Sequence, residues 1–292
     1  MKRFITCIGI LCVVVAGCQR RDAVVVDPGD NFPPLEATSL PGGESKDAIS
    51  SVDSNGVLPS DAANFSGFLL VNNVTYDAGN GVHSDAYAAV YFGDYDKPLL
   101  YNTRTIGYYG IEVPGITINN LPLLRIPYRL RYADFVRDTT FGFVYLRGLN
   151  ATYQAGTDYF WQAPVQTSMG SFSAQIRTPD NVRVLSPAGG SVLSRDKEIL
   201  LQWIGNGDIN IVVSVWNPVN GKTRAILNLR PRLNQGRAAI DPRLLQVLPK
   251  DQRFFVFTFI LANRHDRLEV GQFHGKILVQ AASVYNSYVQ LQ

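Results

Sequence analysis

Cysteine is almost absent from this chain, and its absence excludes several kinds of site. The three cysteines are Cys7, Cys12 and Cys18, so every position after residue 18 lacks a thiol. From there onward a cysteine nucleophile, a zinc site with cysteine ligands and a redox-active pair are excluded, and no internal disulfide can form. The fold must therefore be held together by its hydrophobic core.

Histidine and the common catalytic motifs are scarce as well. The sequence has only three histidines, His83, His265 and His274. It contains no H-E-x-x-H, no P-loop, no G-x-S-x-G and no G-x-G-x-x-G, the motifs that hold metals, phosphates, catalytic serines and dinucleotides. We therefore expect that the protein is not an enzyme and that it has no cofactor or resident metal.

One acidic loop deserves comparison with a calcium site. In Gly93-Asp94-Tyr95-Asp96-Lys97 the alternate aspartates can supply two oxygen ligands. The EF-hand spacing is not met, and Lys97 places a positive charge beside the carboxylates. We expect a hairpin turn here, and the sequence leaves calcium binding by Asp94 and Asp96 open.

The first residues have the pattern of a secretory signal. Lys2 and Arg3 precede an apolar run from Phe4 to Ala16. At about 1.5 Å per residue this run is too short for a hydrocarbon core roughly 30 Å thick. We predict that residues 1–17 are a signal peptide that is removed.

The end of that run, Val15-Ala16-Gly17-Cys18, resembles the lipobox of bacterial lipoproteins. The resemblance implies cleavage before Cys18 and attachment of acyl chains, such as palmitate, to that residue. More than one chain gives a stable anchor. Gln19 in place of aspartate implies transport to the outer membrane, facing either the periplasm or the cell surface. An ordinary secretory signal with a coincidental cysteine is the alternative.

Residues 18–63 are predicted to be a flexible tether. The segment is rich in proline, glycine, serine and aspartate, and it carries three basic residues and eight acidic ones. Such a composition buries too little apolar surface to offset the entropy of ordering. The short run Ala23-Val24-Val25-Val26 is an exception that leaves a strand open.

The rest of the chain is predicted to be all-β, with two β-sandwich domains at residues 64–180 and 181–292. Runs of β-branched and aromatic residues alternate with clusters of glycine, asparagine, aspartate and proline. In the run from Leu123 to Tyr132, period-two alternation predicts that Ile126 faces inward and that three arginines share the outer face. Those arginines are Arg125, Arg129 and Arg131.

Residues 181–292 resemble the immunoglobulin-like or fibronectin-type sandwich. Val182 to Pro187 reads as a first strand, and Ile199 to Trp203 as a second strand with an inward tryptophan. Phe254 to Leu261 is apolar on both faces and predicts a central buried strand. The resemblance implies a fold, which by itself does not identify a function. Residues 64–180 resemble no specific family.

The basic residues are unevenly distributed. Residues 64–180 carry 8 basic and 9 acidic side chains, whereas residues 181–292 carry 14 basic and 7 acidic ones. Arginine suits phosphate and carboxylate groups. The candidate contacts for an anionic partner are Arg125, Arg129, Arg131, Arg224, Arg230, Arg232 and Arg237; a solvated surface is the plainer interpretation.

Together these features favour a lipid-anchored protein of the cell envelope that acts as a non-catalytic binding or scaffolding component. Its expected partners are the membrane, through the lipid on Cys18, and an envelope protein or a glycan, but not nucleic acid. A glycan-binding surface lipoprotein would present two or three coplanar exposed aromatic rings, with the tyrosines of residues 64–180 as candidates. A carbohydrate-active hydrolase would need two carboxylates in a pocket, or a histidine beside one.

Overall fold

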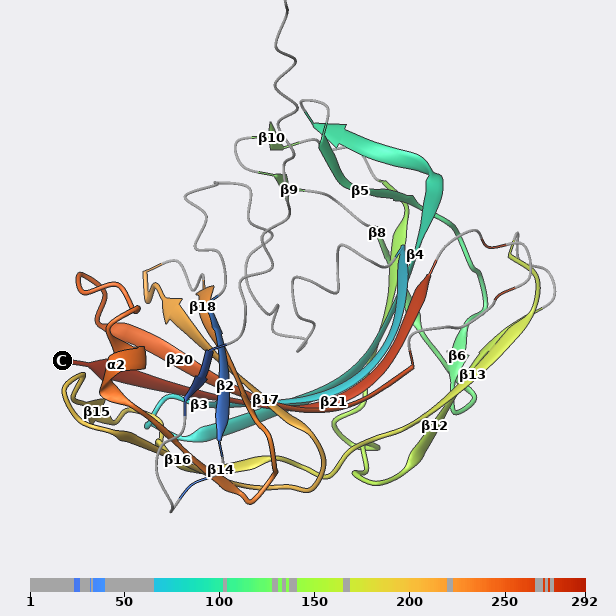
Figure 1. Ribbon diagram of the computed structural model, residues 1–292. Helices are drawn as coiled ribbons and strands as arrows, with labels where there is room; N and C mark the ends of the chain where they lie inside the picture. The colour runs from blue at the N-terminus through green and yellow to red at the C-terminus, as the bar shows by residue number, and fades with distance from the viewer. Residues whose placement is uncertain are drawn as a thin grey trace, which may run out of the picture.

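The computed structural model is built almost entirely of β-strands (Figure 1). It describes residues 24–26, 32, 34–39, 66–101, 104–127, 131–132, 135–136, 141–164, 169–219, 223–265, 270, 273 and 276–292. Three packed sheets and one isolated hairpin account for all the described strands. The hairpin pairs β9 (Arg131–Tyr132) with β10 (Phe135–Val136). The all-β sandwich expected from the sequence is thus confirmed.

A twelve-stranded sheet, here called the large sheet, runs through the whole molecule and curls strongly (Figure 1). Its main path follows the order β1-β2-β18-β17-β20-β21-β3-β4-β11-β8, and β5 and β15 pair with β4 and β21. The strands are β1 (Val24–Val26), β2 (Leu35–Ser39), β18 (Thr223–Pro231), β17 (Ile209–Trp216), β20 (Phe254–His265), β21 (Ile277–Leu291), β3 (Gly67–Asp77), β4 (Val82–Tyr101), β11 (Phe143–Gly148), β8 (Leu124–Pro127), β5 (Arg104–Gly110) and β15 (Val192–Leu193).

The C-terminal half forms a sandwich between part of the large sheet and a three-stranded sheet. The order in the three-stranded sheet is β14-β16-β19, and β18-β17-β20-β21 lie opposite. The C-terminal half is thus a β-sandwich with a three-stranded layer and a four-stranded layer around one core. The three strands are β14 (Arg183–Ser186), β16 (Ile199–Ile204) and β19 (Arg237–Ile240).

The core of this sandwich contains the tryptophan predicted from the sequence. Trp203 on β16 is 2% exposed, lies against Phe259 and donates from Nε1 to Asn234 Oδ1 at 3.0 Å. The prediction that the run beginning at Phe254 is a central buried strand is also confirmed. β20 lies between β17 and β21, and Phe255, Phe257 and Phe259 are fully buried.

The N-terminal half forms a second sandwich on the other part of the large sheet. A four-stranded sheet, in the order β13-β12-β6-β7, covers β3, β4 and the first half of β21. Trp161 and Phe92 are the largest fully buried side chains of its core. The four strands are β13 (Phe172–Arg177), β12 (Asp158–Ala163), β6 (Thr117–Ile118) and β7 (Leu121–Pro122).

The two sandwiches share one sheet across the predicted domain boundary at residue 180. The final strand β21 pairs in parallel with β3 from Ile277 opposite Gly67 to Ser287 opposite Asp77. Val279 packs in the N-terminal core, whereas Val289 packs in the C-terminal core. The shared strand therefore joins the two sandwiches into one body.

The prediction of a flexible tether throughout residues 18–63 is wrong for residues 35–39. β2 pairs with β18 from Leu35 opposite Pro231 to Ser39 opposite Leu227, and Leu35 is completely buried. β1 then pairs with β2, so the run Ala23–Val26, where the sequence left a strand open, does contain a strand at Val24–Val26. The physical reason is that the apolar side chains of Leu35 and Ala37 alternate with Glu36 and Thr38 and complete the C-terminal core.

One short helix, α2 (Pro242–Leu245), connects β19 to β20. Asp241 is its N-cap, with Oδ1 accepting a hydrogen bond from Arg243 N at 2.7 Å, and Pro242 occupies the first turn. Both features are typical of the start of a helix. Within the part of the chain that the structure describes, no helix has the length and apolar character to cross a membrane.

Candidate functional site

The arginine stripe predicted between Leu123 and Tyr132 is not a free surface. Arg125 on β8 shares a face with the buried Tyr145, its pairing partner. Its guanidinium lies 3.5 Å from the centre of the Phe143 ring and 2.9 Å from Glu112 Oε1. Ile126, expected to face inward, is 41% exposed. All four residues of β8 are exposed, because β8 is the last strand on the main path of the large sheet. The aliphatic stem of Arg125 covers an aromatic ring while its charge is paired. Arg129 and the side chain of Arg131 lie outside the described residues.

Two of the predicted C-terminal arginines are paired with acids of the same chain. Arg230 contacts Asp208 at 3.2 Å, and Arg232 contacts Glu36 at 3.1 Å. The second pair holds β2 beside the end of β18, two segments far apart in the sequence. These two ion pairs therefore help to hold together the segments at this side of the large sheet.

Arg224 and Arg237 lie apart from those pairs. Arg224 is exposed near the start of β18, and Arg237 is exposed on β19 with its guanidinium 5.8 Å from the Phe32 ring. The four described C-terminal arginines are thus divided between ion pairs and separate exposed positions. Cys18, the predicted lipid attachment point, lies outside the described residues.

The tyrosines of the N-terminal half divide between core and surface. Tyr145 and Tyr159 are each 2% exposed, and burial raises the pKa of both phenols. Tyr95 is exposed and stacks against Tyr108, with ring centres 5.3 Å apart. Because one face of each ring is covered by the other, this pair is not a row of coplanar rings open to a ligand.

Among the described histidine and acidic-loop candidates, His83 and Asp96 are exposed, whereas Asp94 is partly buried. His83 Nε2 lies 3.2 Å from Asp85 Oδ2, but the side chains are 73% and 49% exposed, so water weakens any mutual activation. In the acidic loop, Asp94 is paired with Lys97 at 2.9 Å and also accepts a bond from Asp96 N. This proximity of Asp94 raises the pKa of Lys97. Among the described residues, no group of three or more histidine, cysteine, aspartate and glutamate side chains is placed to hold a metal.

The outer face of the four-stranded sheet is the best-formed candidate surface. Along β12, Tyr159, Trp161 and Ala163 point into the core, so the alternating residues point to solvent. Of these outward residues, Phe160 is 47% exposed. The outward side chains of β12 and β13 are Asp158, Phe160, Gln162, Ser173, Gln175 and Arg177.

A tight hairpin borders this face. Ile118 pairs with Leu121, so Asn119 and Asn120 form a two-residue loop, both with positive φ, of 46° and 64°. Asparagine tolerates this conformation, and two such residues match a type I′ turn. Asn119 Oδ1 accepts from Phe160 N at 2.8 Å, while Asn119 N donates to Phe160 O at 2.8 Å. The loop is thereby fixed beside the exposed ring.

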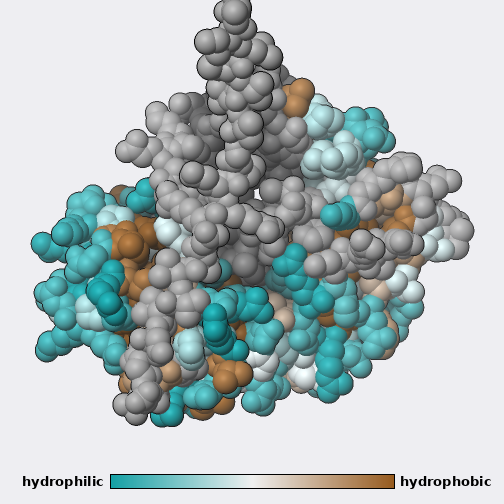
Figure 2. Space-filling model, in the orientation of Figure 1, coloured by the Kyte–Doolittle hydropathy of each residue, from teal (hydrophilic) through white to brown (hydrophobic). Residues whose placement is uncertain are grey.

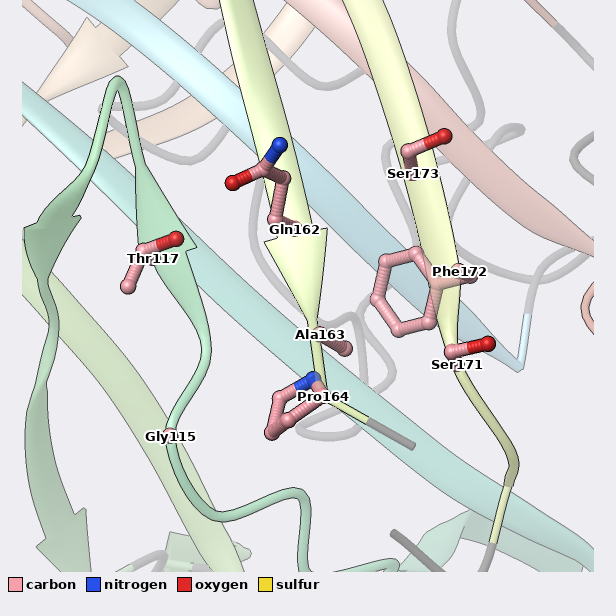
Figure 3. Close-up of a pocket in the computed structure, with 8 residues that line it drawn as sticks. All are labelled: Gly115, Thr117, Gln162, Ala163, Pro164, Ser171, Phe172 and Ser173. Carbon is pink, nitrogen blue, oxygen red and sulfur yellow. The ribbon is translucent and has the colours of Figure 1, made fainter. Parts of the chain in front are cut away.

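Two shallow hollows lie side by side on this face. The larger, of about 570 Å³, is drawn in Figure 3, where Thr117, Gln162 and Ser173 project from three neighbouring strands. The smaller, of about 330 Å³, is lined by Asn119, Asn120, Asp158, Phe160 and Gln162. Gln162 lines both, so the hollows form one continuous surface, here called the amide face.

The chemistry of the amide face suits recognition of a neutral polar ligand. Amides both donate and accept hydrogen bonds, hydroxyls do the same, and Asp158 accepts. The electron-rich face of the Phe160 ring attracts weakly positive C–H groups. Sequence reasoning missed these residues, although the alternation from Asp158 to Ala163 and the Asn-Asn pair were available signals.

Comparisons with known proteins add little to this description. No protein-family model and no curated protein match the chain. One solved structure, the yeast delta-COP-I mu-homology domain, aligns with 78% of this chain and 98% of its own length at 8% identity, with a TM-score of 0.20. A likeness this weak carries no argument about fold or function.

Proposed function

We propose that this chain is a lipid-anchored protein of the bacterial outer membrane whose β body binds a partner without catalysing a reaction. The lipobox resemblance at Val15–Cys18 supports the anchor. The observation that carries the binding role is the amide face, an open surface where an exposed aromatic ring adjoins hydrogen-bonding side chains. The open, solvent-screened setting of the His83–Asp85 pair gives no support to hydrolysis.

Replacing Cys18 by alanine should abolish acylation. We expect the Cys18→Ala chain to lose incorporated acyl label and to leave the outer-membrane fraction, because the thiol that accepts the lipid is gone. The measurement is metabolic labelling with a palmitate analogue, followed by membrane fractionation and mass determination. Cys12→Ala is the matched control and should keep the label. Label that persists in Cys18→Ala, or that never appears in the parent chain, contradicts the anchor.

A glycan is the ligand class that the amide face favours. Its polar side chains are mostly uncharged, and the exposed ring of Phe160 offers a stacking surface for a sugar. An envelope protein is the other partner class, and the described residues show no comparable feature in its favour. The variant Phe160→Ala distinguishes the two classes.

Phe160→Ala should weaken binding to polysaccharide about tenfold, since one lost stacking contact of roughly 1.4 kcal/mol corresponds to that factor. Affinity electrophoresis through gels containing dextran, xylan or lipopolysaccharide measures the effect. Tyr95→Ala removes an exposed aromatic ring elsewhere and should leave migration unchanged. If no polysaccharide retards the parent chain, but a cross-linked envelope protein is lost in Phe160→Ala, the ligand is a protein and the glycan proposal fails.

A further inference from the structure

The direction of β1 indicates which end of the body faces the predicted anchor. Val24 of β1 lies opposite Ala37 of β2, and Ala37 lies opposite Leu229 of β18. Because both pairings are antiparallel, β1 runs parallel to β18. The N-terminal end of β1 therefore points toward Thr223, where β18 begins.

The chain between the anchor and the body is short. Six residue steps separate Cys18 from Val24, and a fully extended chain spans at most about 3.6 Å per residue, or roughly 20 Å in total. The distance from Leu229 to Thr223 along β18 is also about 20 Å, at 3.3 Å per residue. This end of the large sheet is therefore within reach of a lipid on Cys18, and it lies in the direction in which the N-terminal end of β1 points.

Four strand termini of the C-terminal sandwich meet at this end, here called the proximal end. Trp216, the last residue of β17, pairs with Thr223, and Phe254, the first of β20, pairs with Gln290 near the end of β21. Trp216 is half-buried, with its ring centre 4.9 Å from that of Tyr288. Tryptophan and tyrosine are the residues enriched at the boundary between lipid and water.

Exposed apolar residues also belong to the proximal end. Val219, in the turn after β17, is 93% exposed, and Val247, after α2, is 51% exposed. In Figure 2 the lobe on the left, which contains α2 and β20, shows hydrophobic residues interspersed among hydrophilic ones. Mixed apolar and basic character is typical of surfaces that rest on a membrane.

The cations of the proximal end are largely unneutralised. A hollow of about 590 Å³ is lined by Arg195, Lys250 and Arg253, with Asp196 as an acidic neighbour. Arg195 is fixed by donating to the carbonyls of Pro249 and Gln252, at 3.0 and 2.6 Å. Within the described residues, Arg224, Lys250 and Arg253 have no ion-pair partner, whereas Arg230 and Arg232 at the opposite end of β18 are both paired.

We propose that the proximal end rests on the bilayer that holds the lipid, where Arg224, Lys250 and Arg253 contact the phosphates of anionic headgroups. This inference depends on the proposed lipidation of Cys18. The short connection brings the surface to the membrane, and the cations bind it there. Each basic side chain near an anionic membrane adds a favourable interaction that salt weakens.

Quenching of Trp216 by headgroup-labelled lipid tests the proposal directly. Trp161 and Trp203 are buried in the two cores, so a spin label at the headgroup should affect Trp216 alone. The lipidated chain is inserted into vesicles of phosphatidylethanolamine and phosphatidylglycerol, with phosphatidylcholine vesicles as comparison. We expect quenching in the anionic vesicles that decreases as salt is raised.

Removing the three cations should shift the docking equilibrium on the order of 100-fold, at about fivefold per base. The test variant replaces Arg224, Lys250 and Arg253 by glutamine. The control replaces Arg177, Arg183 and Lys276 by glutamine, exposed cations elsewhere on the body, and should quench like the parent. Equal quenching in test variant and parent, or equal loss in the control, overturns the proposal.

A lengthened connection separates this inference from the proposed anchor. A flexible Gly-Ser insertion after Asp22 should leave the chain acylated and membrane-bound while Trp216 quenching falls. If the parent chain is acylated but Trp216 is not quenched, the orientation is wrong and the anchor stands. If the parent chain is not acylated, the proposed function fails first.

Discussion

Replacing Phe257 by alanine should lower the free energy of unfolding by about 3–5 kcal/mol, a large part of the stability of an ordinary domain. Phe257 is fully buried on β20, between β17 and β21, in the core of the C-terminal sandwich. The loss combines the transfer free energy of the ring with the cavity it leaves. Urea unfolding followed by tryptophan fluorescence measures it.

The matched control for this truncation is the same substitution on a surface. Phe160→Ala removes an identical side chain that is 47% exposed, so it should cost much less, under about 1 kcal/mol. Similar losses in the two variants would mean that Phe257 does not lie in a close-packed core. A folded Phe160→Ala also validates its use in the binding experiment.

Replacing Asp77 by alanine should cost about 2–4 kcal/mol, because this carboxylate ties the two sandwiches together. Its Oδ2 accepts from Gly189 N and from Tyr285 Oη, both at 3.0 Å, and its Oδ1 accepts from Gly79 N at 3.0 Å. A Cβ on Gly189 would collide with Asp77 itself, so the approach is close. Chemical denaturation measures the loss, with Asp208→Ala as an exposed acidic control.

The pKa of Tyr285 provides a second test of the hydrogen bonds by which Asp77 joins the two sandwiches. Burial, followed by the hydrogen bond and charge of Asp77, raises its pKa to about 12. The folded state therefore favours the neutral phenol, and this contribution is complete below pH 10 and lost as pH rises toward 12. Asp77→Asn should lower the pKa of Tyr285, seen by ultraviolet titration. An unchanged pKa of Tyr285 in Asp77→Asn, or a loss of unfolding free energy below about 1 kcal/mol in Asp77→Ala, contradicts the role of Asp77 in joining the two sandwiches.

The strands that were predicted well are those whose pattern is decided locally. The run from Ile199 to Trp203 was predicted as a strand with an inward tryptophan, and it forms β16, Ile199–Ile204. Asp241 and Pro242 specify the start of α2 through capping chemistry alone. In such segments the nearest neighbours in sequence supply most of the information, so no knowledge of distant contacts is needed.

The errors arose where a distant partner overrides local composition. Leu35–Ser39 lies among prolines and glycines, yet it forms β2 because the edge of β18 offers backbone hydrogen bonds and the core accepts Leu35. Ile126 alternates as an inward residue should, yet β8 is the last strand on the main path of the large sheet, and its residues are exposed. Sequence periodicity identifies two faces but not which face is covered.

The candidate binding surfaces also depend on contacts between residues that are distant in the sequence. The excess of basic residues after position 180 is a property of composition, but its division into paired and unpaired arginines depends on acids such as Glu36 and Asp208, brought close by folding. The amide face requires three strands separated by up to about sixty residues to lie side by side. Spatial neighbours of this kind leave no signature in a single sequence.

By itself the sequence determined the all-β class, the buried strand at Phe254–Leu261, the inward Trp203 and the absence of cysteine chemistry beyond residue 18, because each follows from side-chain type and local alternation. Only the tertiary structure decided that β21 pairs with β3, so that two sandwiches share one sheet. It also decided that Val24–Val26, a few residues after Cys18 in the sequence, pairs with β2 as part of the body. The reason is physical: strand pairing is made through backbone groups that every residue carries, so its partners are chosen by the packing of the whole core.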